Sequence, residues 1–192
     1  MGAQIPIATT RSATGVPTGR LAVWWVIASE IVIFGGILVA YILGRLMNDY
    51  WGADAANTNV LAGSVNTFVL LTSSLFVVLA HQAAENKETD KAFRYIWLTI
   101  LGGLIFLVIK SFEWSYEIHH GMTITSSRFW SFYYTAAGIH GLHVIAGMII
   151  MGIISFDVKK GKFLHRVENI GIYWHFVDIV WIFLFPLLYI AK

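Results

Sequence analysis

Residues 132–156 read FYYTAAGIHGLHVIAGMIIMGIISF and contain no Asp, Glu, Lys or Arg. A helix of about 20 apolar residues crosses the hydrocarbon core of a bilayer, so this stretch can span a membrane once. Similar apolar runs occur at residues 21–43, 60–80, 92–112 and 170–190. Because in lipid only a helix pairs every backbone N–H and C=O within one segment, the sequence predicts an all-α integral membrane protein with five transmembrane helices in a bundle.

The composition supports this interpretation. Hydrophobic residues make up 57% of the 192 residues and charged residues only 12%, with a net charge of +2, whereas soluble domains carry about 25% charged residues. The absence of cysteine excludes disulfides, thiolate metal sites and iron–sulfur clusters from this chain. No stretch outside the spans reaches the roughly 50 residues of a soluble domain. We therefore expect a flexible cytoplasmic tail over residues 1–20 and a membrane domain over residues 21–192.

The distribution of Lys and Arg predicts the orientation. Nine of the 13 fall on the side that holds the N-terminus and the loops after the second and fourth spans, and four fall on the other side. Cytoplasmic loops of membrane proteins carry the excess of positive charge. The sequence thus places the N-terminus in the cytoplasm and the C-terminus outside.

Two acids lie deep in the spans, Glu30 in the first and Asp178 in the fifth. An acidic residue at mid-span costs about 3 kcal/mol on insertion scales, so such residues are functional or paired. Glu30 is either a proton-exchanging or gating carboxylate or a buried acid that ties helices together. Lys110 lies near a span end, where its side chain is expected to snorkel to the interface. Glu113 and Glu117 follow it, just outside the predicted span.

Three histidines also fall within the spans. His140 and His143 are three residues apart and share a helix face, as do His175 and Asp178. Hydrogen bonding between helices, to which Asn66 would contribute from the second span, is one interpretation, and a hydrogen-bonded His175–Asp178 pair is its simplest form. A haem or metal site built from these histidines is the other.

Four segments and a shorter fifth resemble subunit III of the haem–copper terminal oxidases, the cytochrome c oxidases and quinol oxidases. The likeness covers about residues 20–190. The fourth span carries the family's Gly-x-His-Gly-x-His pattern, and the last helix matches almost letter for letter. The segments are Ser29–Phe34 with Ala40-Tyr41, Val65–Leu71 running to Ala80-His81, Phe112–Tyr116, Gly138–Gly147 and Tyr173–Trp181.

The resemblance implies a five-helix bacterial form that lacks the first two helices of the longer members. It implies an accessory subunit without redox chemistry, in the bacterial plasma membrane. The haems and copper are expected in the partner subunits and none in this chain. The expected partners are the catalytic subunit I, subunit II, phospholipids and a respiratory supercomplex.

The resemblance also assigns roles to residues. Glu30 matches the family's carbodiimide-reactive glutamate, while His140, His143, His175 and Asp178 become helix-packing groups. The role implied is to sustain proton uptake and the stability of a proton-pumping complex during reduction of O2 to water. A proton-collecting cytoplasmic surface would be formed by His81, Glu85, Glu88 and Asp90.

Other functions stay open at this point. Related five-helix proteins accompany nitric oxide reductases, and the sequence does not separate the two because the chemistry resides in the partner. From other classes, a di-histidine membrane cytochrome and a proton transporter are the alternatives.

Overall fold

A computed structural model describes residues 18–49 and 51–191. Its elements, in chain order, are α1 (Thr18–Leu46), α2 (Trp51–Ala55), α3 (Val60–Glu85), α4 (Thr89–His119), α5 (Arg128–Lys159), α6 (His165–Phe185) and the π-helical turn η1 (Pro186–Ile190). The expected tail lies almost wholly in residues 1–17, outside the described residues.

The prediction of five membrane-spanning helices is confirmed. Within the described residues the structure is helical without strands, and five helices are long and apolar enough to cross a membrane. Four of the predicted spans lie inside a longer helix, and the fifth, residues 170–190, begins in α6 and ends with η1. The helices extend beyond the apolar stretches because their backbone hydrogen bonds remain paired there. The extra turns carry polar and charged residues.

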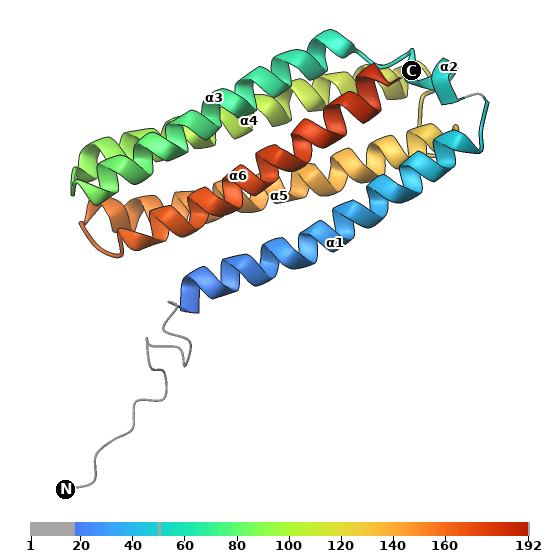
Figure 1. Cartoon of the computed structure of the whole chain (residues 1–192). Coiled ribbons are helices and arrows are strands. Elements are labelled where there is room, and N and C mark those ends of the chain that lie inside the picture. The colour runs from blue at the N-terminus through green and yellow to red at the C-terminus, as the bar shows by residue number, and fades with distance from the viewer. Residues whose placement is uncertain (1–17, 50, 192) are drawn as a thin grey trace, which may run out of the picture.

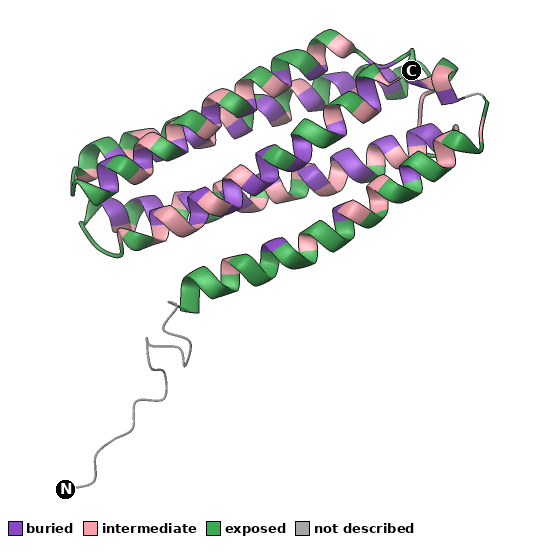
Figure 2. Cartoon of the chain, in the orientation of Figure 1, coloured by how far each residue is buried: buried purple, intermediate pink, exposed green. Residues whose placement is uncertain are grey.

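Helix α6 occupies the centre of the bundle. It contacts α3, α5 and α1, and runs between the α3–α4 pair and the α5–α1 pair (Figure 1). Half of the residues in its most apolar stretch are buried, against 17% for α1. Helix α1 packs on α5 and α6 and is mostly exposed (Figure 2). The motif of the last helix therefore lies where most of the packing occurs.

The bundle has two distinct ends (Figure 1). The start of α1 and the turns at residues 86–88 and 160–164 lie at one end, which we call the basic end because the excess of Lys and Arg gathers there. The opposite α2 end holds α2, the loop 120–127 and η1. The loops after the second and fourth spans thus lie at the same end as the start of α1, as the count of Lys and Arg assumed. The cytoplasmic location of the basic end stays a prediction.

The indole of Trp174 fixes the packing of three helices. It is fully buried, and its Nε1 donates to Ser73 Oγ on α3 at 3.1 Å. A Cβ added at Gly103 of α4 or at Gly147 of α5 would lie 2.9 Å from the indole ring. The two glycines therefore provide the space for this side chain. Of the three glycines in the Gly138–Gly147 motif, only Gly147 is needed for a close approach, because a Cβ at Gly138 or Gly141 would meet neighbours at 3.7 and 3.8 Å.

Candidate functional site

Glu30 faces a partner from another helix. Its Oε2 lies 3.1 Å from Nε2 of His143 on α5, and the two side chains are only 15% and 20% exposed. Nδ1 of His143 lies 2.8 Å from the carbonyl oxygen of Ile139. A carbonyl can only accept, so Nδ1 carries a hydrogen, and the contact with Glu30 needs one further proton on either the carboxyl or Nε2. The pair thus joins α1 to α5, a contact that sequence spacing could not reveal.

The surroundings of this pair hold its geometry. The ring of Phe34 packs edge-on against the imidazole at 5.5 Å between centroids. The hydroxyl of Tyr173 on α6 donates to the backbone carbonyl of His143 at 3.2 Å. The carboxyl stays partly accessible from the face of α1. Glu30 therefore combines a fixed partner with access from outside the protein.

The expectation of a hydrogen-bonded His175–Asp178 pair is wrong. Nδ1 of His175 instead lies 2.7 Å from Oγ of Ser74 on α3. Asp178 is buried, and neither of its carboxyl oxygens has a hydrogen-bond partner among the described residues. Residues three apart share a helix face but reach different neighbours, because each side chain meets the helix opposite it. His175 thus joins α6 to α3, as a packing residue would.

His140 and Asn66 are both fully buried. The imidazole of His140 stacks on Trp181 at 5.2 Å between centroids and lies edge-on to Phe106 at 5.5 Å. Neither its ring nitrogens nor the side-chain amide of Asn66 has a hydrogen-bond partner within the described part of the chain. His140 therefore packs by its ring faces, and residues 18–49 and 51–191 supply neither residue with the expected hydrogen bonds.

The three intramembrane histidines have separate neighbours rather than a common centre. His140 packs on Trp181, His143 pairs with Glu30, and His175 faces Ser74. Across residues 18–49 and 51–191, no three His, Asp or Glu side chains come close enough together to hold a metal ion.

Lys110 and the two acids that follow it lie inside the protein. The expectation that Lys110 snorkels to the interface is wrong, and Glu113 and Glu117, just outside the predicted span, are also buried: the three residues are 4%, 6% and 1% exposed. The ammonium of Lys110 lies 3.1 Å from Glu113 Oε2. We call these residues and the tyrosines bonded to them the Lys110 cluster, which consists of Lys110, Glu113, Glu117, Tyr133, Tyr134 and Tyr189.

The proposed proton-collecting residues gather at one turn. In the last turns of α3, Nε2 of His81 lies 3.6 Å from Oε1 of Glu85, and Glu88 pairs with Lys91 at 2.8 Å at the start of α4. Asp90 lies beside them in the first turn of α4 and is exposed. All four predicted residues therefore lie on the α3–α4 turn at the basic end.

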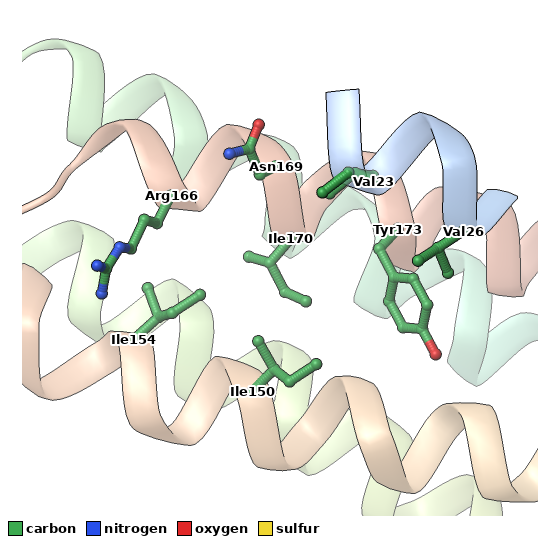
Figure 3. A pocket seen from close by; sticks show the side chains of 9 residues that line it. Val23, Val26, Ile150, Ile154, Arg166, Asn169, Ile170 and Tyr173 are labelled. Carbon is green, nitrogen blue, oxygen red and sulfur yellow. The ribbon is translucent and has the colours of Figure 1, made fainter. Parts of the chain in front are cut away.

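An apolar groove runs between α1, α5 and α6 in the half of the bundle nearer the basic end (Figure 3). Its volume is about 260 Å³. Arg166 lies at one end of the groove, which we call its mouth, and Tyr173 lies at the other (Figure 3). Arg166 also pairs with Asp157 at 3.1 Å. A further ion pair, Arg20 with Glu168, joins α1 to α6. The lining residues are Ala22, Val23, Val26, Ile150, Ile154, Arg166, Asn169, Ile170 and Tyr173.

The five-helix architecture and the polar pairs across its helices define a multi-pass integral membrane protein with intramembrane protonatable groups. Residues 9–192 match the family model described as cytochrome c oxidase subunit III. The chain belongs to the cytochrome c oxidase subunit III family.

Individual relatives agree with the family model. The chain is 34% identical to cytochrome c oxidase subunit 3 of Corynebacterium diphtheriae over 86% of its own length and 84% of the relative's. It is 32% identical to cytochrome c oxidase subunit 3 of Thermostichus vulcanus over 84% and 82% of the two chains. A haem–copper oxidase subunit I+III of Aeropyrum pernix is 29% identical over 90% of this chain, which corresponds to 22% of that longer protein.

Proposed function

We propose that the protein is the non-redox accessory subunit of a proton-pumping haem–copper oxidase in the bacterial plasma membrane, where it packs on subunit I beside subunit II. Its family membership supports this role. The Aeropyrum relative, named subunit I+III, supports subunit I as the neighbour, since its name joins the two subunits in one chain. Purification of the chain with its partners should give the absorption spectrum of the haems. Recovery of a stable chain with no haem–copper subunit attached would contradict the assignment.

Glu30 is the protonatable residue of this proposal, and its pairing with His143 is the observation that carries it. The carboxyl holds or shares one proton, is 15% exposed, and lies on the least buried helix. A lipid-soluble carbodiimide reacts with a protonated carboxyl that it can reach. We expect Glu30→Gln to abolish labelling while leaving assembly intact, because the amide has the same shape and can still contact His143.

Asp178→Asn is the matched control for this experiment. Asp178 is the other deep intramembrane acid, but it is 3% exposed and lies in the central helix. Its variant should label as the wild type does. Labelling that persists in Glu30→Gln and disappears in Asp178→Asn would assign the reactive group to α6 and refute the role of Glu30.

The groove between α1, α5 and α6 supports a phospholipid site. Its walls are apolar and its mouth carries the guanidinium of Arg166, which suits an acyl chain below an anionic headgroup (Figure 3). Arg166→Gln should lower the phospholipid retained by the purified complex. Lys162→Gln removes a positive charge from the same end, outside the groove, and should leave the retained lipid unchanged. Equal amounts of phospholipid retained by the two variants would refute a lipid site in this groove.

The α3–α4 turn supports proton uptake on the cytoplasmic side. Exposed carboxylates and a histidine within one turn can bind protons from bulk water and pass them along the surface. The combined variant Glu85→Gln, Glu88→Gln, Asp90→Asn should reduce the number of turnovers that the oxidase completes before it inactivates. An unchanged turnover lifetime would refute the surface role.

The orientation has its own test, because the chain contains no cysteine. A single cysteine introduced at Lys87 should react with an impermeant thiol reagent only from the cytoplasmic side. Reaction from the outside would reverse the proposed topology.

A further inference from the structure

The Lys110 cluster combines one cation with two carboxyl groups in a buried position. Lys110, Glu113 and Glu117 come from α4, Tyr133 and Tyr134 from α5, and Tyr189 from η1. If both acids were ionised, the cluster would carry one uncompensated negative charge where almost no water reaches. Such a charge is costly in a low-dielectric interior, and adding one proton to the cluster removes it.

The hydrogen bonds of Lys110 distinguish the two acids. An ammonium has three hydrogens, and Lys110 directs them to Glu113 Oε2 at 3.1 Å, to the hydroxyl of Tyr133 at 2.9 Å, and to the hydroxyl of Tyr189. Glu113 is thus the direct ion-pair partner. Among the described residues, the carboxyl of Glu117 has no hydrogen bond to the ammonium and is bonded only by tyrosines.

The hydrogens of these tyrosines place the extra proton. Tyr133 lies 2.9 Å from Glu117 Oε1 and donates its one hydrogen there. The hydroxyl of Tyr134 lies 2.7 Å from the carbonyl oxygen of Met122 and only 3.4 Å from Glu117 Oε2. A carbonyl can only accept, so the shorter contact uses the single hydrogen of Tyr134. The contact with Oε2 then becomes a hydrogen bond if the carboxyl of Glu117 supplies the hydrogen.

We propose that Glu117 is a proton-binding site, a neutral carboxylic acid that donates from Oε2 to Tyr134 and keeps the Lys110 cluster electrically balanced. The groups that face it are Lys110 and Glu113 of α4, Tyr133 and Tyr134 of α5, and Tyr189 of η1. Helix α4 ends two residues later at the exposed His119, so the cluster lies toward the α2 end of the bundle. The site is separate from Glu30 and does not depend on the role proposed above.

Infrared difference spectroscopy of the purified complex tests this assignment. A protonated carboxyl group absorbs through its C=O stretch, which shifts in D2O, whereas a carboxylate absorbs elsewhere. The wild-type-minus-Glu117→Gln spectrum should show loss of one protonated-acid band. The wild-type-minus-Glu113→Gln spectrum should show loss of carboxylate bands instead. The two substitutions are chemically identical and lie about one helical turn apart, so each is the control for the other.

The amide of Glu117→Gln also mimics the proposed state, because its NH2 group can donate to Tyr134 as the acid does. Assembly and thermal stability should therefore match the wild type. Lys110→Met removes the only cation from the cluster and should add a second protonated-acid band, from Glu113. Loss of carboxylate bands in Glu117→Gln, or failure of that variant to assemble, would overturn the proposal.

Discussion

Gly147 of α5 offers a strong test of how the bundle is packed. A methyl group added there would lie 2.9 Å from Cε3 and Cζ3 of Trp174 and 3.3 Å from Cε1 of Tyr173. The indole has little room to retreat, because Gly103 lies against another part of the same ring and Nε1 is bonded to Ser73. Overpacking costs about 1–3 kcal/mol. Loss of the indole hydrogen bond adds about 1 kcal/mol.

We therefore expect Gly147→Ala to lower the free energy of unfolding by about 2–4 kcal/mol. In a domain of this size that corresponds to a fall in Tm on the order of 10 °C. In the assay, the purified complex in detergent is heated in steps, and the fraction of the chain that stays folded and bound is measured at each temperature. Gly152→Ala on the same helix is the control, since no atom beyond the adjacent helix backbone lies within 4 Å of its added methyl group. Equal midpoints for the two variants would refute the packing argument.

Three further changes test single contacts, each by the same heating assay. Trp181→Phe removes the Nε1 bond to Thr67 and weakens the stack on His140, so it should cost about 1–2 kcal/mol; Trp97→Phe, on an exposed face, should cost little. Asn59→Ala removes the side-chain cap on the Ala62 N–H at the start of α3 and should cost about 1 kcal/mol. Ser74→Ala removes the partner of His175 and should cost about 1 kcal/mol. Midpoints unchanged from wild type would refute the corresponding contact.

The number and order of the spanning helices could be predicted from the sequence because each apolar run satisfies a bilayer-length requirement by itself. The ends of the helices could not. A hydropathy criterion stops the third span at Phe112, before the next charged residue. Helix α4 continues to His119, and tyrosines of α5 and η1 cover only the face that carries Lys110, Glu113 and Glu117. The burial of Glu113 and Glu117 depends on those neighbours, and the apolar run itself carries no sign of them.

The polar pairs could not be predicted from the sequence for a similar reason. Glu30 and His143 are 113 positions apart and meet because α1 and α5 cross at that depth. The signal that could have pointed to the Lys110 cluster is the spacing of Lys110, Glu113 and Glu117 on one helix face, with tyrosines at the start of the following span. That spacing is equally compatible with a solvated surface, so only the packing distinguishes the two.

The central position of Trp174 has a consequence for biogenesis. Its indole needs the glycine of α4 and the glycine of α5 to be adjacent before it can be seated, and α6 follows both helices in the chain. During synthesis the first four spanning helices must therefore remain in the membrane without the helix that joins them. Interruption of translation before α6 would leave a bundle with an open centre, a natural substrate for the proteases that remove unassembled membrane subunits.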